Sequence, residues 1–134
     1  MRTTVLTVIL LAAASAVAVP PCKPKLEHLK PDQARIENLQ VQKVNSGKED
    51  WRRDPKQTVQ HEIYGGLAQS QAKTPDMIPV TFVKGDDKTQ VFSYTAPDRR
   101  VEITLKKPEW LLPYSGIYKL MMWVATDVKT VCTK

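Results

Sequence analysis

Two histidines are the first side chains to consider for catalysis, because the chain offers few other general bases. His28 follows a segment rich in proline and lysine, and His61 is followed directly by Glu62. A histidine and a carboxylate can serve as base and acid in hydrolases and nucleases. The apolar alternation around His61 predicts a strand, in which neighbouring side chains point to opposite faces. His61 and Glu62 would then not meet at one substrate atom, so the sequence predicts no catalytic residues and no enzyme.

The other polar residues show no spacing that would hold a metal, a phosphate or an activated nucleophile. The two histidines lie far apart, and the carboxylates are scattered without the spacing of metal ligands. Five glycines in 134 residues leave no glycine-rich phosphate loop, and a Gly-x-Ser-x-Gly elbow is absent. The sequence therefore predicts neither a metal nor another cofactor.

The chain is basic, with 20 Lys and Arg against 14 Asp and Glu and a net charge of +6. The basic pairs Arg52-Arg53, Arg99-Arg100 and Lys106-Lys107 are separated by acidic residues and are not interleaved with aromatic residues. Nucleic-acid interfaces combine clustered basic residues with interleaved aromatic residues. This chain has neither arrangement, so we expect no nucleic acid partner. Ordinary solvated strand faces and turns explain most of these charges, and the functional use that the charge favours is attraction to an anionic membrane surface.

The first 18 residues have the pattern of a secretory signal. Arg2 gives a positive start, residues 5–11 are apolar, and Ala16-Val17-Ala18 matches a cleavage site. The apolar run is shorter than the ~20 residues that a membrane span needs. We therefore expect a secreted protein whose single domain covers residues 19–134, and a lysosome-like compartment stays open as its destination.

The two cysteines stand near the two ends of this domain, at Cys22 and Cys132. In an oxidising compartment two such thiols most simply form a disulfide with each other. The alternative is two unpaired thiols. A disulfide between these positions would require the first and last elements to lie side by side.

Short strands separated by turn residues predict an all-β sandwich. Residues 34–44 fit either a bulged strand or a short helix that Asp32 would cap and Gly47 would end. The first predicted strand is 59–65. Residues 78–82 and 90–94 are predicted to form a hairpin joined by Gly85-Asp86-Asp87. The remaining predicted strands are 101–105, a central strand at 117–124, and 128–132.

The segment from Lys106 to Gly116 combines an apolar loop with basic residues. Pro108 and Pro113 enclose Trp110, Leu111 and Leu112, and Lys106 and Lys107 precede them. Tryptophan prefers the headgroup level of a bilayer, and lysine pairs with phosphate there. These five apolar and basic side chains are therefore candidates for a membrane-contact loop. The alternative is that Trp110 and Leu111 fold back onto the core as a lid.

The closing segment resembles that of the secreted lipid-recognition (ML) superfamily, in its ganglioside-activator branch. The residues that carry the resemblance are Glu109-Trp110-Leu111, Ser115-Gly116-Ile117-Tyr118-Lys119-Leu120 and Lys129-Thr130-Val131-Cys132. Residues 34–41, 57–64 and 79–83 are similar in outline to earlier strands of that branch. The branch has more cysteines and a longer middle region, whereas here 84–107 holds two strands and no cysteine.

This resemblance implies an immunoglobulin-like β-cup of about seven strands that binds, presents or transfers a lipid or glycolipid between two sheets. The side chains expected to line that cavity are Ile63, Val80, Phe82, Phe92, Ile103, Leu120 and Met122. The alternative function is a secreted sandwich that binds a protein partner, as an effector, an inhibitor or a receptor ligand. A lipid carrier would keep its excess apolar area in a cavity, and an interaction module would show it on the surface.

Overall fold

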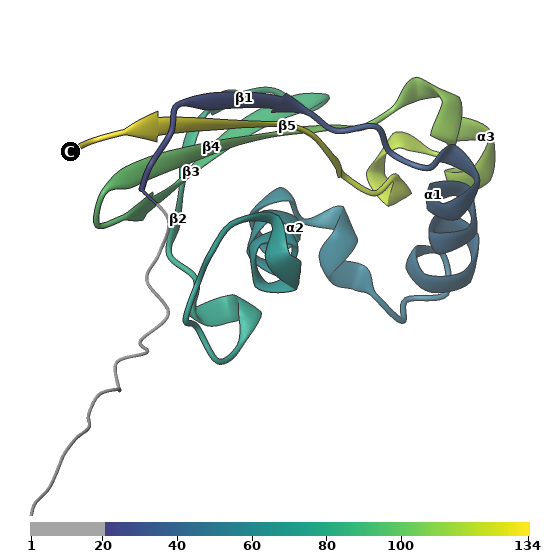
Figure 1. Cartoon of the computed structure of the whole chain (residues 1–134). Coiled ribbons are helices and arrows are strands. Elements are labelled where there is room, and N and C mark those ends of the chain that lie inside the picture. The colour runs from purple at the N-terminus through teal and green to yellow at the C-terminus, as the bar shows by residue number, and fades with distance from the viewer. Residues whose placement is uncertain (1–20) are drawn as a thin grey trace, which may run out of the picture.

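The chain forms one antiparallel sheet of five strands, seen in a computed structural model that describes residues 21–134 (Figure 1). The signal predicted at 1–18 lies outside the described residues. The sheet has the order β1-β5-β4-β3-β2, so β1 and β2 are its edges. Its strands are β1 (Lys25–His28), β2 (Val80–Gly85), β3 (Thr89–Ala96), β4 (Arg99–Lys106) and β5 (Val124–Cys132).

Two longer helices lie between β1 and β2 in the sequence. α1 (Gln33–Leu39) continues as a π-helical turn at Gln40–Val44, and α2 (Pro55–Glu62) continues as another at Ile63–Leu67. The remaining helical turns are Asp50–Arg53, Pro75–Met77, Glu109–Leu111, α3 (Leu112–Ser115) and Tyr118–Leu120. Within residues 21–134, no helix is long and apolar enough to cross a bilayer.

Both longer helices begin at an aspartate. Asp32 accepts a hydrogen bond from the backbone N–H of Arg35, and Asp54 accepts one from that of Gln57. Pro55 takes the first helical position, where its missing N–H has no intrahelical partner to lose. Residues 34–44, which fit either a strand or a helix, are therefore helical.

The strand predicted at residues 59–65 is wrong, because α2 and its continuation occupy this segment. Val59 and Ile63 are buried and lie four positions apart, on one side of a helix. His61 between them is not in the core. The apolar pattern of Val59, His61, Ile63 and Gly65 therefore resembled a strand only because a histidine and a glycine were counted with the buried residues.

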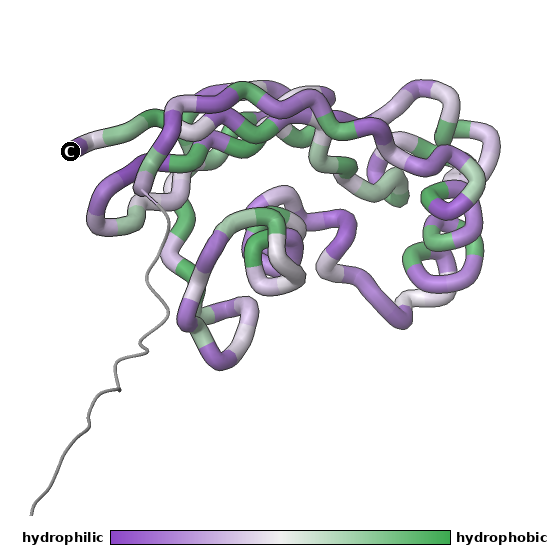
Figure 2. Tube along the Cα trace, viewed as in Figure 1, coloured by the Kyte–Doolittle hydropathy of each residue, from purple (hydrophilic) through white to green (hydrophobic). Residues whose placement is uncertain are grey.

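The main core lies between the sheet and α2. Val59 and Ile63 from the helical side pack with Phe92, Ile103 and Leu105 from the sheet. Figure 2 shows hydrophobic and hydrophilic positions alternating along the strands, as expected for a sheet with one covered face. Helices thus form the second layer, and the described residues make one sheet in place of the two sheets and about seven strands expected.

A second core cluster joins α1 to the C-terminal part of the chain. Its buried residues are Ile36, Val44, Leu111, Met121, Met122 and Val124. The central strand predicted at 117–124 is also wrong: this segment contains the helical turn Tyr118–Leu120, and β5 starts only at Val124. Met121, Met122 and Val124 are buried with Ile36 of α1, Trp123 is buried in the main core, and Ile117 is exposed.

The disulfide prediction is confirmed. Cys22 and Cys132 are bonded, with their Cα atoms 5.8 Å apart and a sequence separation of 110. β1 pairs antiparallel with β5, from Lys25 opposite Thr130 to His28 opposite Asp127. The hairpin of β2 and β3 and the half-buried strand β4 are likewise confirmed.

Candidate functional site

The side chains of three paired residues, Thr89, Lys106 and Val124, form a row across one end of the sheet. Lys106 is the last residue of β4, and it pairs with Thr89 of β3 and with Val124 of β5. The preceding residue, Leu105, is fully buried against α2, whereas Lys106 is exposed. Because side chains alternate along a strand, Lys106 projects from the opposite face of the sheet.

The segment after β4 folds back beside this row and forms one wall of an open cavity of about 390 Å³. Leu111 is fully buried in the second core cluster and fixes the segment there. The cavity is lined by Pro31, Lys88, Thr89, Lys106, Lys107, Pro108, Glu109, Trp110, Tyr118, Val124 and Thr126. Its size lies at the low end of the range of about 300–1,000 Å³ typical of small-molecule sites.

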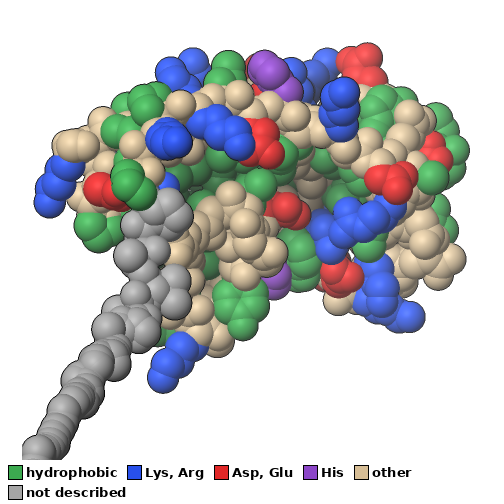
Figure 3. Space-filling model, viewed as in Figure 1, with side chains coloured by type: hydrophobic (Ala, Val, Ile, Leu, Met, Phe, Trp, Pro, Cys, Tyr) green, Lys and Arg blue, Asp and Glu red, His purple; other side chains and the backbone are tan. Residues whose placement is uncertain are grey.

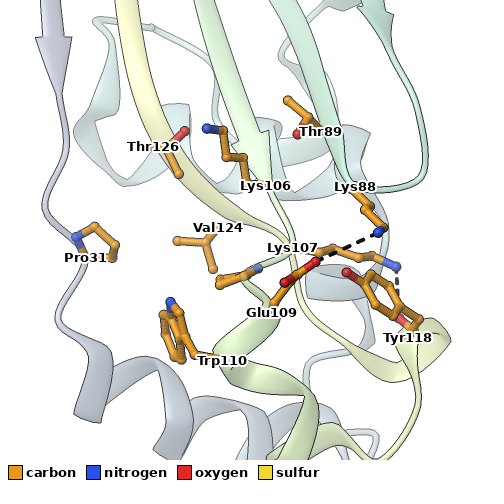
Figure 4. A pocket seen from close by; sticks show the side chains of 11 residues that line it. Pro31, Lys88, Thr89, Lys106, Lys107, Glu109, Trp110, Tyr118, Val124 and Thr126 are labelled. Atoms are coloured by element: carbon orange, nitrogen blue, oxygen red, sulfur yellow. Dashed lines mark hydrogen bonds and ion pairs between the residues drawn. The ribbon is translucent and has the colours of Figure 1, made fainter.

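The cavity has an apolar side and a cationic side. Figure 4 shows Pro31, Val124 and Trp110 on the side toward β1, and Lys88 and Tyr118 on the opposite side. The Lys106 side chain lies beside Thr126, above Val124. Such a division suits a ligand with an apolar body and an anionic end, since each part would meet matching side chains.

The turn between β2 and β3 positions Lys88. Gly85 has φ +143°, and a Cβ added there would lie 2.3 Å from the backbone oxygen of Thr89. Only glycine permits this close approach. The carboxylate of Asp86 accepts hydrogen bonds from the backbone N–H groups of Lys88 (2.8 Å) and Thr89 (3.0 Å). These bonds lower the pKa of Asp86 and hold the turn.

Lys107 has a structural role at the base of the cavity. Its Nζ donates to the backbone oxygen of Tyr118 at 3.0 Å and lies 5.1 Å from the centre of the Trp123 ring. Burial lowers the pKa of its ammonium group. Lys107 therefore ties the returning segment to the sheet, and Lys88 is the more accessible cation on this side.

Lys88 is loosely paired with a carboxylate of the protein itself. Its Nζ lies 3.9 Å from Oε1 of Glu109, and it also lies 5.5 Å from the centre of the Tyr118 ring. Both charged side chains are largely exposed, so water screens their attraction. An anionic ligand would compete with Glu109 for Lys88.

Tyr118 carries a buried hydroxyl without a hydrogen-bond partner among the described residues. A buried unpaired polar group costs about 1–3 kcal/mol. We therefore expect Tyr118→Phe to keep the free energy of unfolding or raise it by up to about 1 kcal/mol, as measured by urea unfolding. The control is Tyr94→Phe, because the Tyr94 hydroxyl donates to the backbone oxygen of Gln69 at 3.3 Å. A larger loss for Tyr118→Phe than for Tyr94→Phe would contradict this reading.

The seven side chains predicted to line a lipid cavity do not surround one space. Ile63, Phe92 and Ile103 belong to the main core and Met122 to the second cluster. Phe82 is 52% exposed on the edge strand β2. Val80 packs against the main core and Leu120 is half-buried. None of the seven lines the cavity beside Lys106.

The predicted membrane-contact loop is divided between three environments. Lys106, Lys107 and Trp110 line the cavity. Leu111 is fully buried, which excludes it from membrane contact in this conformation. Leu112 is 37% exposed. The predicted alternative is that Trp110 and Leu111 fold back onto the core as a lid. Leu111 is buried in the second core cluster, and Trp110 is partly buried against the same cluster.

Sequence reasoning missed Lys88, Pro31 and the cavity-facing position of Tyr118. Lys88 stands in a charged turn, where exposed lysines are common and carry no sign of a site. The pairing of β3 with β4 brings this turn to the segment after β4. A sequence pattern within one element contains no such information.

A second cavity, of about 520 Å³, lies among the helices and includes His61 and Glu62. His61 and Glu62 were expected on opposite faces of a strand. That argument does not apply, because both residues belong to the helix α2. The His61 ring stacks on Trp51 with 3.7 Å between ring centres, and the Arg52 guanidinium lies 4.2 Å from the centre of the Trp51 ring. Burial lowers the pKa of His61 and raises that of Glu62.

This second cavity lacks the hydrogen bonds of an acid–base pair. In the described part of the chain neither the His61 ring nor the Glu62 carboxylate has a hydrogen-bond partner. A general base is normally oriented by such a bond. Among residues 21–134, no group of three or more His, Cys, Asp or Glu side chains is placed to hold a metal ion.

No protein-family model, curated protein sequence or solved structure matches the chain. The resemblance to the lipid-recognition superfamily therefore stays a prediction. The cavity beside Lys106 has to be interpreted from its own side chains.

Proposed function

We propose that this protein binds an anionic amphiphile, a lipid with a carboxylate or phosphate head, in the cavity beside Lys106. The observation that carries the proposal is the division of that cavity into an apolar side with Trp110 and a cationic side with Lys88. The lipid is thus held at one end of a single sheet, where the apolar segment after β4 returns to it, and not between two sheets.

The apolar part of the ligand lies against Trp110, Val124 and Pro31. Each buried methylene group contributes about 0.8 kcal/mol, so a short stretch of acyl chain accounts for most of the affinity. A volume of about 390 Å³ favours part of one acyl chain over two. The head lies near Lys88, where it replaces Glu109 as the partner of the ammonium group.

The first test is a titration with decanoate and with decanol, which share one chain and differ in charge. We expect decanoate to bind more tightly, and Lys88→Gln to weaken decanoate about tenfold, the equivalent of one charge-assisted hydrogen bond of ~1.4 kcal/mol. Glu109→Gln should strengthen decanoate binding, because it removes the competing carboxylate. Trp110→Ala should weaken both ligands, because it removes apolar wall.

The matched control is Lys73→Gln, which makes the same charge change at an exposed lysine outside the cavity. Native mass spectrometry of protein from a eukaryotic secretion host tests the proposal independently, by the mass of co-purified lipid. A protein that is empty and takes up neither decanoate nor decanol would refute the proposal, as would equal losses for Lys88→Gln and Lys73→Gln.

The second candidate function, binding to a protein partner, is favoured by edge strand β2. Phe82 and Val83 on this strand are 52% and 44% exposed, and Met77 before it is 62% exposed. Partner segments can add to an exposed edge strand through main-chain hydrogen bonds. Under this alternative Phe82→Ser abolishes partner binding, whereas under the amphiphile proposal it leaves the decanoate titration unchanged.

A further inference from the structure

Three apolar side chains are exposed on the segment that forms one wall of the cavity. Leu112, Tyr114 and Ile117 are 37%, 41% and 54% exposed. They lie in the sequence between Trp110 and Tyr118, which both line the cavity. We call these three residues the apolar tip. The apolar tip therefore belongs to the same short segment as the proposed ligand site.

The backbone under the apolar tip is fixed by contacts on both sides. Leu111 is fully buried, and the side chain of Asn45 donates to the backbone oxygen of Tyr114 at 2.8 Å. Gln40 donates to the backbone oxygen of Leu120 at 2.7 Å. The exposed side chains are thus held outward on an ordered backbone. Figure 3 shows hydrophobic side chains at this end of the molecule, where α1 and α3 lie in Figure 1.

Basic side chains without ionic partners lie on the segment that carries the apolar tip and on the segment that holds it through Asn45. Lys43 and Lys48 belong to the segment that holds Tyr114 through Asn45, and Lys119 follows the apolar tip in the sequence. All three are exposed, and none forms an ion pair in the described part of the chain. Excess positive charge next to exposed apolar side chains matches the surface of an anionic bilayer.

The acidic residues of this region are mostly neutralised within the protein. Asp50 pairs with Arg53 at 3.7 Å, and Glu49 pairs with Arg52 at 3.0 Å. Glu37 lies close to the Tyr114 hydroxyl and raises its pKa. Glu109, three positions before Leu112, is only loosely paired with Lys88 at 3.9 Å. Glu37 and Glu109 thus remain against the three unpaired lysines, so the net charge around the apolar tip is still positive.

We propose that the apolar tip inserts into the headgroup region of an anionic bilayer, with Lys43, Lys48 and Lys119 against lipid phosphates. This inference rests on the proposed function, because the apolar tip lies in the sequence between Trp110 and Tyr118, which line the ligand cavity, and an amphiphile would enter that cavity from the membrane. Tyrosine favours the headgroup level, and leucine and isoleucine favour the acyl boundary.

The test is co-sedimentation of the protein from a eukaryotic secretion host with vesicles of equal parts phosphatidylcholine and phosphatidylserine. We expect Leu112→Ser with Ile117→Ser to weaken vesicle binding at least about tenfold, because two apolar side chains no longer leave water. The matched control is Met77→Ser with Phe82→Ser, at apolar side chains that are 62% and 52% exposed on another part of the surface. The control variant should bind as the wild type does.

Charge is tested in the same assay. Lys43→Gln with Lys119→Gln should weaken binding to the serine-containing vesicles, and Lys56→Gln with Lys73→Gln, which makes the same change in net charge, should not. Equal losses in the two charge variants, or in the two serine variants, would overturn the inference, as would a wild-type protein that does not sediment with vesicles.

A titration with decanoate below its micellar concentration separates this inference from the proposed function. The apolar-tip variant should bind decanoate as tightly as the wild type, because Leu112 and Ile117 do not line the cavity. Decanoate binding without vesicle binding refutes the membrane inference alone. Vesicle binding that depends on the apolar tip, without decanoate binding, refutes the amphiphile proposal and supports membrane docking.

Discussion

Replacing both Cys22 and Cys132 with serine should lower the free energy of unfolding by about 4–5 kcal/mol. The disulfide closes a loop of 110 positions, and loop-entropy models give a stabilisation of this size for a loop of about 100 residues. It also holds the edge strand β1, only four residues long, beside β5. Urea unfolding followed by tryptophan fluorescence measures the difference.

The control for this prediction is the wild-type protein with its disulfide chemically reduced, which should unfold at the same urea concentration as the double serine variant. Because β1 leads directly to Pro31 at the cavity wall, the variant should also bind decanoate more weakly. A loss of less than about 1 kcal/mol would show that the unfolded chain gains little freedom when this loop opens.

Gln40→Leu should lower the free energy of unfolding by roughly 3–5 kcal/mol, the sum of several buried hydrogen bonds. Gln40 is fully buried, and its side chain joins α1 to the segment that carries Tyr118. Its amide nitrogen donates to the backbone oxygen of Leu120 (2.7 Å), and its oxygen accepts from the N–H of Met122 (2.9 Å). Leucine fills the space and leaves both backbone groups without partners.

The matched control is Gln42→Leu, two positions along the same helical turn, where the side chain is exposed. This variant should change the free energy of unfolding by less than about 0.5 kcal/mol. Decanoate binding by Gln40→Leu should weaken as well, since the helical turn Tyr118–Leu120 loses its hydrogen bond to Gln40. Equal stabilities of the two leucine variants would show that water replaces the lost hydrogen bonds.

Some elements follow directly from local residue patterns. The turn at Gly85-Asp86-Asp87 needs a glycine with positive φ and an aspartate that accepts backbone hydrogen bonds, and both residue types are visible in the sequence. β4 alternates Val101, Ile103 and Leu105 with polar residues because one face of the sheet is covered and the other is exposed. The disulfide follows from two cysteines at the two ends of the domain.

Other elements could not be assigned from local patterns, because the burial of each residue depends on distant partners. Val59 and Ile63 are compatible with one face of a strand or one side of a helix, and their contacts with the sheet decide in favour of the helix. The apolar segment before β5 resembles a buried strand, yet Met121 and Met122 are buried against α1. Apolar composition indicates burial without identifying the partner.

The residue types needed for a lipid site are apparent in the sequence: Trp110 beside two leucines, with Lys106 and Lys107 before them. The cavity itself depends on tertiary structure, because its walls come from the segment after β1, the turn before β3, the end of β4 with the segment after it, and the start of β5. The pairing of β3 with β4 and of β4 with β5 brings these segments together. Local propensity acts over a few residues, whereas strand pairing and core packing join residues that are far apart in the chain.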